Sequence, residues 1–360
     1  MEEIQKSELK KSCANCGAEL KFKPGSQQLT CEYCGYEEFI ESSKSSFEEL
    51  ELAHYLKIVG ENAYTETIDL LHCKNCGANQ HVEENYKSLD CVYCSEPLIR
   101  EDVEQEGWIL PGALVPFQLD AKKAQNIFKN WVGSLWFAPD NLKRAALDPE
   151  GLHGLYVPYW TFDAQLFASY QGERGDYYYE TETYRTNKGK QTRQVRKTRW
   201  RRALGTVNGL IDDILINASQ KKRRDIPASV AFWNLKELVV FNSKYLSGFV
   251  TEKYTVSLKE GHHQSFEEAK NIAYNWIRRD IGGDTQRISN ADIKLSEETF
   301  KHILLPIYIS SYRYSGTEYH FSVNGQTGVL SGSRPYSFWK IFFLVVFILV
   351  VIGVFAIFAK

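Results

Sequence analysis

An apolar run at the C-terminal end of the chain constrains its fold more than any other stretch. From Ile341 to Ala359 the sequence contains no charged and no polar side chain. A helix of this length would rise about 28 Å, close to the ~30 Å hydrocarbon core of a bilayer. A helix also satisfies its backbone hydrogen bonds within the segment, which lipid requires. The run therefore predicts one transmembrane helix over residues 338–359.

The residues that flank this run are of the type found at a membrane interface. Trp339 and Lys340 precede it and Lys360 follows it, and an aromatic residue beside a cation is a common interface anchor. A buried core helix is the alternative, but such a helix rarely stays apolar all round for this length. Arg334 and Lys340 before the run also favour a cytoplasmic location for the N-terminal bulk of the chain.

All eight cysteines lie before residue 95, in two sets with the same spacing. Each set contains two Cys-x-x-Cys pairs separated by fourteen residues, and the two sets are offset by 60 residues. Zn²⁺ prefers four tetrahedral ligands, and a Cys-x-x-Cys turn holds two sulfurs at a suitable separation. We therefore predict two zinc ribbons, over 8–40 and 69–99, with two zinc ions. The predicted ligands are Cys13, Cys16, Cys31, Cys34, Cys73, Cys76, Cys91 and Cys94.

The four-sulfur sets also limit what these modules can do. Iron would fit the same ligands, whereas a complete set of four disfavours a redox dithiol. Unoxidised thiols indicate a reducing compartment, which for a tail-anchored protein is the cytosol. Four protein ligands leave no coordination position for water, so catalysis at the metal is not expected. Each module has few apolar residues, and bound metal is expected to supply the folding energy.

The charge of the N-terminal region favours protein partners for the ribbons. Residues 1–106 carry 22 acidic and 10 basic side chains, a balance that argues against a phosphate backbone as the partner. Within the linker 41–68, the capping-box pattern Ser46–Glu49 and the stop signal Gly60 predict a short helix over 47–59. The charged stretch 100–106 is predicted to be a second linker.

The region after the ribbons contains a weaker internal repeat. Ala124–Val132 matches Ala269–Ile277 at an offset of 145 residues, and Tyr156–Trp160 matches Leu304–Tyr308 at an offset of 148. Two matches at nearly the same offset indicate a duplication. The sequence therefore predicts an α+β body made of two similar units.

Each unit, 108–246 and 247–335, is predicted to contain a strand, a helix and a long β-hairpin. The first helix should begin after Asp120, and the second at the capping box Ser265–Glu268. Asn324-Gly325 predicts the turn of the second hairpin. The complete fold class is then α+β, with two four-cysteine ribbons, a duplicated body and one C-terminal transmembrane helix.

The first hairpin has an unusual concentration of positive charge. Nine Lys or Arg residues and no acid lie between Arg185 and Arg202, and Lys221–Arg224 adds four more. A solvated β-ribbon is the plain interpretation. Anionic lipid headgroups are the preferred ligand in a tethered protein, and nucleic acid is the second choice because Trp200 lies among the arginines. The candidate cations are Arg193, Arg196, Lys197, Arg199, Arg201 and Arg202.

The sequence lacks the usual signatures of enzymes. It contains no phosphate-binding loop and no GxSxG, HExxH or GxGxxG motif. We therefore do not expect an enzyme.

Several short motifs accompany the twin ribbons. They are Val157-Pro-Tyr-Trp-Thr-Phe-Asp163, Gly172-Glu-Arg-Gly175, Thr198-Arg-Trp200, Asp280-Ile-Gly-Gly-Asp284, Thr299-Phe-Lys-His302 and Asn324-Gly-Gln-Thr-Gly328. With these features nearly the whole chain resembles the bacterial TFIIB-type zinc-ribbon membrane proteins, which are often labelled as primosomal helicase or replication factor Y. The absent phosphate-binding loop argues against helicase activity.

The resemblance implies zinc, a bacterial inner membrane and an association with flotillin-like (SPFH) and phage-shock-type proteins. Combined with the anchor and the closed metal sites, it predicts a single-pass scaffold whose cytoplasmic ribbons dock other proteins in a membrane-stress assembly. The alternative is a membrane-tethered zinc-ribbon protein that binds nucleic acid.

Overall fold

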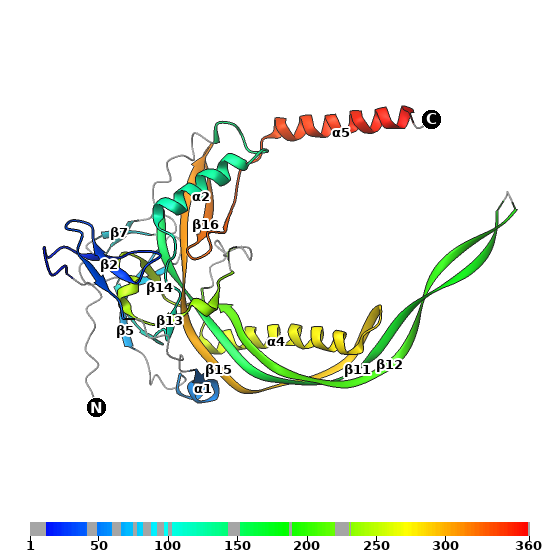
Figure 1. Ribbon diagram of the computed structural model, residues 1–360, viewed down its shortest axis with the longest axis horizontal. Helices are drawn as coiled ribbons and strands as arrows, with labels where there is room; N and C mark the ends of the chain where they lie inside the picture. Colours follow the sequence, from blue (N-terminus) through cyan, green and yellow to red (C-terminus); the bar gives the residue numbers. More distant parts are fainter. Residues whose placement is uncertain are drawn as a thin grey trace.

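The computed structural model describes residues 12–41, 49–59, 66–74, 78–81, 88–91, 97–99, 103–142, 152–186, 189–219, 230 and 232–358. Within these residues the chain is a mixed α+β protein (Figure 1). The helices are α1 (Leu52–Val59), α2 (Ala121–Ser134), α4 (Leu258–Ile281) and α5 (Phe338–Phe358), with the 3₁₀ turns η2 (Leu235–Glu237) and η3 (Ser243–Leu246). The strands are β1 (Leu20–Phe22), β2 (Gln28–Cys31), β3 (Glu37–Phe39), β4 (Leu50–Glu51), β5 (Glu66–His72), β6 (Asn79–His81), β7 (Ser88–Asp90), β8 (Pro97–Ile99), β9 (Val103–Trp108), β10 (Ala113–Leu114), β11 (His153–Thr186), β12 (Gly189–Asn217), β13 (Val239–Val240), β14 (Val250–Glu252), β15 (Thr285–Tyr314), β16 (Thr317–Asn324) and β17 (Leu330–Gly332).

Two very long antiparallel strands, β11 and β15, form the centre of the main sheet. Val157 pairs with Leu305, and each of these residues precedes a proline. On the outer side of β15 lies β10, which runs parallel to it, and on the outer side of β11 lies the equally parallel β14. The order β10-β15-β11-β14 therefore alternates between the two sequence repeats, and the short strand of each repeat lies beside the long strand of the other.

The helices of the two repeats cover strands of the opposite repeat. Phe128 of α2 stacks on Phe321 of β16, with ring centroids 3.8 Å apart. The buried side of α4, which includes Ala273 and Ile277, joins the core beneath β11 and β12 with Leu166. Each repeat thus buries its apolar helix stripe only when the other is folded, because the partner strands come from the other half of the chain.

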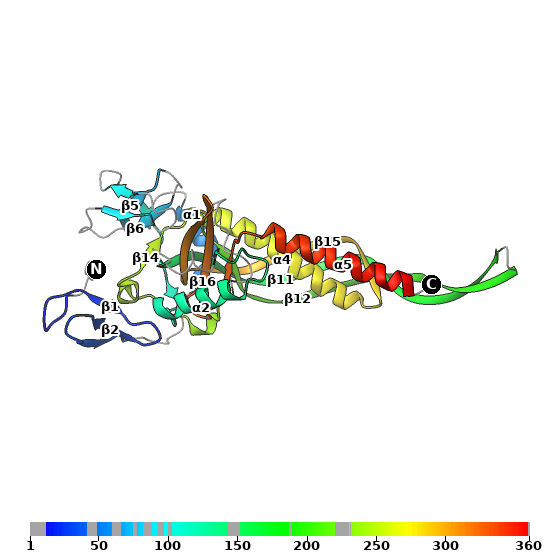
Figure 2. The same ribbon diagram turned by 90° about the horizontal axis from the view of Figure 1, so that it is seen from above.

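Beyond the body, β11 and β12 continue as a two-stranded arm. The pairing with β15 begins at Thr285, opposite Gly175, whereas β11 and β12 remain paired to Thr186 and Gly189. We call the paired residues 173–186 and 189–202 of β11 and β12 the basic ribbon, and its outer part, beyond the end of β15, projects far from the body in Figures 1 and 2. Among the described residues no third strand pairs with β11 beyond Gly175, so this part of the chain is held by the pairing of β11 with β12 alone.

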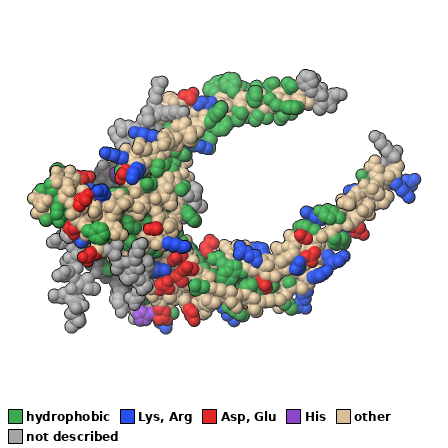
Figure 3. All heavy atoms as spheres, viewed as in Figure 1, with side chains coloured by type: hydrophobic (Ala, Val, Ile, Leu, Met, Phe, Trp, Pro, Cys, Tyr) green, Lys and Arg blue, Asp and Glu red, His purple; other side chains and the backbone are tan. Residues whose placement is uncertain are grey.

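The C-terminal helix α5 is the second arm of the molecule. It is the one helix among the described residues that is long and apolar enough to cross a membrane, and none of its 18-residue span Phe338–Phe355 is buried. Figure 3 shows its apolar surface in green, opposite the charged ribbon arm. The expected C-terminal apolar helix is therefore present, with its first turn held to the body by Lys340, which donates to the Ala138 carbonyl and to Asp140.

Several predicted elements begin or end elsewhere. The second predicted helix, α4, begins at Leu258. Ser257 and Glu260 form its capping box, about two turns before the predicted start at Ser265. The linker helix begins at Leu52 rather than 47, since Leu50 and the next residue pair with β15 as β4.

The charged stretch predicted as a linker at 100–106 and the predicted hairpin turn are also corrected. Residues from Val103 onward form β9, which pairs with β5. The turn between β15 and β16 is Ser315-Gly316, with φ of 49° and 80°. Asn324-Gly325 does begin a hairpin turn, but this turn joins β16 to β17, and Asn324 N–H donates to the Val329 carbonyl across it. The Asn324 side-chain amide also donates to backbone carbonyls at Val230 and Phe232.

Candidate metal centre

The first cysteine set forms two matching backbone turns. Cys13 N–H donates to the Ala18 carbonyl and Cys31 N–H donates to the Tyr36 carbonyl, at 2.7 and 2.8 Å. A glycine follows each pair, and both Gly17 and Gly35 have a φ of 73°. That left-handed conformation favours glycine, because it lacks a Cβ. The sequence pattern Cys-x-x-Cys-Gly therefore encodes the turn as well as the ligands.

These turns bring four sulfurs together. The Sγ atoms of Cys13 and Cys34 are 3.4 Å apart and those of Cys16 and Cys31 are 3.5 Å apart, with all four within 4.8 Å of one another. A tetrahedral zinc ion with bonds of about 2.3 Å separates its sulfur ligands by about 3.8 Å. The donor set and its spacing therefore fit one metal ion and are compatible with a zinc ribbon.

The backbone of the second turn favours a thiolate at Cys31. Its pKa is lowered to about 7, because the backbone N–H groups of Cys34 and Tyr33 donate to its sulfur. A thiolate is the form that binds a metal. The pKa of the neighbouring Cys34 is raised instead, so within this set the backbone favours the negative charge on Cys31.

The first ribbon, β1-β2-β3, is fused to the body rather than tethered to it. Phe22 N–H donates to the Ser247 carbonyl at 3.0 Å, and Gly25 N–H donates to the Phe117 carbonyl at 2.8 Å. The Phe22 ring packs edge-on against Tyr245 at 5.1 Å. Because its apolar residues share one buried cluster with the body, metal is not the only source of stability for this module.

The outer end of this ribbon carries an exposed aromatic side chain. Tyr33 lies between two ligands of the second turn and is 85% exposed. Cys16 and Cys34 are exposed at the same end, whereas Cys13 and Cys31 are buried. The ribbon therefore presents a rigid tip, fixed on one side by the body and open on the other.

Part of the second cysteine set repeats these features. Cys73 N–H donates to the Ala78 carbonyl at 2.8 Å, as Cys13 does to Ala18 in the first ribbon. Cys91 is buried, and Gln80 donates to its sulfur at 3.2 Å. Cys76 and Cys94 lie outside the described residues, so the second metal site stays a prediction.

The structure divides the six candidate cations between the two faces of the ribbon. Side chains alternate between faces along a strand, and the pairing of β11 with β12 is unbroken here. Arg196 and Arg202 therefore share one face with Trp200. The remaining four lie on the opposite face, and they are Arg193, Lys197, Arg199 and Arg201.

The two faces differ in how their cations are compensated. On the second face, Lys197 forms ion pairs with Glu180 and Glu182, and Arg193 forms one with Glu182. On the first face, the Arg196 guanidinium lies 4.3 Å from the centre of the Tyr177 ring. Sequence reasoning missed this division, although the alternation of residues would have shown it. The basic segment predicted at 221–224 lies outside the described residues.

Comparison with known proteins gives one distant likeness across almost the whole length. The chain is 26% identical over 348 residues to the uncharacterized protein YdjG of Bacillus subtilis strain 168, a match that covers 91% of each chain. No family model and no solved structure matches it.

Proposed function

We propose that this protein is a single-pass scaffold whose zinc ribbons bind other proteins at the cytoplasmic face of a bacterial inner membrane. One observation carries the proposal: a single chain joins an unburied apolar helix to a closed four-sulfur site with an exposed tip. The membrane-stress partners, flotillin-like and phage-shock-type proteins, rest on the family resemblance. The role assigned to the protein is binding rather than catalysis.

The fusion of the first ribbon to the body supports a docking role. A scaffold holds a bound partner at a defined place when its binding surface is fixed to the rest of the protein. Here Ser247 connects the ribbon to the body through two hydrogen bonds, one from Phe22 N–H and one from its own Oγ to the Leu20 carbonyl. Lys244 adds an ion pair with Glu38 at 3.1 Å. The ribbon that carries Tyr33 is therefore fixed to the body, and the body is joined to α5 in the same chain.

Membrane anchoring sets a condition on the direction of α5. In Figures 1 and 3 both α5 and the basic ribbon extend to the same side of the body. Charged side chains are costly in hydrocarbon, so the ribbon does not enter the bilayer alongside the helix. We expect the direction of α5 relative to the ribbon to change when the helix enters a bilayer. The body would then lie beneath the leaflet, with the ribbon running outside the hydrocarbon.

Affinity purification from solubilised membranes tests the docking role. Full-length protein should recover partners that are lost with Tyr33→Ala, which removes the tip but no metal ligand. Cys31→Ser should lose the same partners through disruption of the ribbon. Glu32→Gln, a neighbouring exposed change that keeps Tyr33, is the matched control. Unchanged partners in both Tyr33→Ala and Cys31→Ser would rule out docking through this ribbon.

A second function is favoured by the aromatic-supported cations of the ribbon. Arg196 lies 4.3 Å from the centre of the Tyr177 ring, and Arg199 lies 5.2 Å from that of Tyr178. Such mixtures bind phosphate groups and stack on bases. Nucleic-acid binding through the ribbon is the alternative to contact with anionic lipid, and it predicts affinity that falls steeply with salt.

A further inference from the structure

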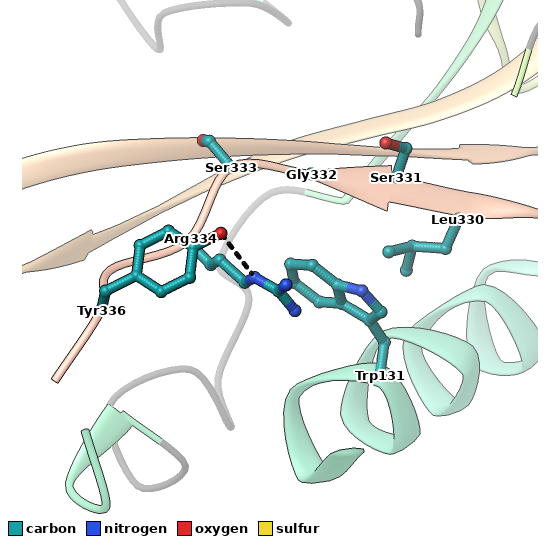
Figure 4. Close-up of a pocket in the computed structure, with 7 residues that line it drawn as sticks. All are labelled: Trp131, Leu330, Ser331, Gly332, Ser333, Arg334 and Tyr336. Atoms are coloured by element: carbon teal, nitrogen blue, oxygen red, sulfur yellow. Dashed lines mark hydrogen bonds between the residues drawn. The ribbon is translucent and has the colours of Figure 1, made fainter. Parts of the chain in front are cut away.

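A cavity lies beside the point where the chain enters α5. Its volume is about 480 Å³, and it opens between α2 and the segment that follows β17 (Figure 4). The lining residues are Trp131, Leu330, Ser331, Gly332, Ser333, Arg334 and Tyr336. The site differs from both the cysteine cluster and the basic ribbon.

Arg334 is the cation of this cavity. Its side chain extends between Tyr336 and Trp131, with the guanidinium end directed toward the indole (Figure 4). Its Nε donates to the Tyr336 hydroxyl at 3.5 Å, and the guanidinium carbon lies 5.4 Å from the centre of that ring. Within the described part of the chain, no carboxylate forms an ion pair with Arg334, so its terminal N–H groups are free of the anionic partner that would compete for them.

Lys340 provides an internal comparison. It lies six residues further along the chain and is equally close to the membrane end of the body. Its ammonium already bonds Asp140, at 2.6 Å. The two cations therefore differ: Lys340 is neutralised by a carboxylate, whereas Arg334, among the described residues, contacts Tyr336 and faces a cavity.

The surroundings of the cavity resemble a membrane interface. Phe338, the first residue of α5, lies four positions after Arg334. Trp136 is 80% exposed and Trp339 is 64% exposed, and Trp and Tyr concentrate at the level of lipid headgroups. A ligand in the cavity would therefore lie where headgroup phosphates lie.

We propose that this cavity binds the phosphate ester of an anionic membrane lipid, with Arg334 as the phosphate ligand and Trp131 and Tyr336 as its walls. The guanidinium group presents paired donors that match two phosphate oxygens. Basic pockets at the cytoplasmic ends of membrane helices bind lipid headgroups by the same chemistry. The proposal rests on the membrane anchoring proposed above, and it adds a specific lipid contact to that anchor.

Full-length protein in mild detergent, mixed with phosphatidylglycerol or phosphatidylcholine and examined by native mass spectrometry, tests the site. Phosphatidylglycerol should bind in preference. Arg334→Gln should weaken its binding about tenfold or more, because a charge-assisted hydrogen bond is lost, and Arg334→Lys should retain part of it. Lys340→Gln, which removes the same charge outside the cavity, should change binding less than about twofold.

Two further measurements separate the sources of phosphate and the parts of the proposal. Glycerol phosphate in solution should not displace the lipid; if it binds as tightly as the lipid, the lipid assignment is wrong. Flotation with vesicles is measured for every variant. A wild-type protein that fails to float overturns both anchoring and site, whereas flotation with equal lipid binding by wild type and Arg334→Gln overturns the site alone.

Discussion

The ammonium group of Lys301 on β15 lies 3.4 Å from the Asp163 carboxylate on the neighbouring strand β11, and the two side chains are only 10% and 8% exposed. Asp213 on β12 lies at the same distance from this ammonium, and Glu49 lies 3.3 Å away. One cation thus faces three carboxylates from three separate parts of the chain. Burial raises the pKa of both Asp163 and Asp213.

The cluster lies where the long sheet is irregular. The pairing of β11 with β12 shifts between Phe162 and Ala164, and Asp213 at this bulge has a φ of 54°. Asp213 N–H donates to Asp163 at 2.6 Å. A bulge bends a strand and redirects a side chain, which here brings the second carboxylate to Lys301.

Lys301→Met should destabilise the protein by about 3 kcal/mol near neutral pH, because it leaves buried carboxylates without their cation. A carboxyl whose folded pKa is raised loses folded-state stability as pH rises through that pKa. The deficit should therefore be larger near pH 8 than near pH 5, because protonation of carboxyls with a raised pKa relieves the repulsion as pH falls. Thermal unfolding in detergent at both pH values measures it.

Lys294→Met is the matched control for this change. Lys294 pairs with Asp292 at 3.3 Å, but both side chains are more than half exposed. Such a pair contributes at most about 1 kcal/mol. Equal losses of stability in the two variants, or a Lys301→Met deficit that grows as pH falls, would contradict the role given to Lys301.

Substitution of two glycines should change the free energy of unfolding in opposite directions. A Cβ on Gly209 of β12 would lie 2.9 Å from the Trp276 ring of α4, whereas one on Gly133 of α2 would meet nothing within 4 Å. Gly209→Val should cost about 1–3 kcal/mol through overpacking. Gly133→Ala should gain about 0.5–1 kcal/mol from helix propensity. Thermal unfolding of both variants checks the pair, and a destabilised Gly133→Ala would show an unrecognised contact at α2.

Local signals in the sequence predicted local structure well. The spacing of Cys13, Cys16, Cys31 and Cys34 anticipated a four-sulfur cluster, because a Cys-x-x-Cys turn fixes its own geometry. Asp120 was correctly identified as the start of the first helix, since its carboxylate accepts from Lys123 N–H. Such features depend on a few adjacent residues, which the sequence states directly.

Features that depend on distant pairing were missed. Two capping boxes compete at the start of α4, and the earlier one is used because Gly261 lets the helix continue past the Trp160 indole, 2.8 Å from a would-be Cβ. Gly172 lies inside β11 opposite Ile288 of β15, where a Cβ would come within 2.4 Å of the Arg287 carbonyl oxygen, and no local signal shows this pairing. The cluster likewise joins Lys301 to carboxylates that are 88, 138 and 252 positions away in the sequence.

Metal content should follow the cysteine sets independently. Cys31→Ser should lower the zinc content by one ion per chain, measured by inductively coupled plasma mass spectrometry, because one of four thiolates is lost. Cys73→Ser should remove a second ion if the predicted second site exists. Tyr33→Ala, which changes the same turn without removing a ligand, should keep its zinc. Full zinc content in Cys31→Ser would exclude the four-sulfur centre.

The face of the ribbon that carries Arg196 and Arg202 should dominate its binding to anionic surfaces. A protein ending at residue 337 suits the measurement, since the removed helix is unburied and no longer masks weaker contacts. Replacing both arginines by Gln should weaken sedimentation with phosphatidylglycerol vesicles by roughly 2 kcal/mol, at about 1 kcal/mol per cation near an anionic leaflet. Lys197→Gln together with Arg193→Gln removes the same charge from the face already paired with carboxylates and should have a smaller effect. Equal losses from the two double variants would show that net charge, rather than the face that carries it, determines binding. Tighter, salt-sensitive binding to DNA than to vesicles would favour the nucleic-acid alternative.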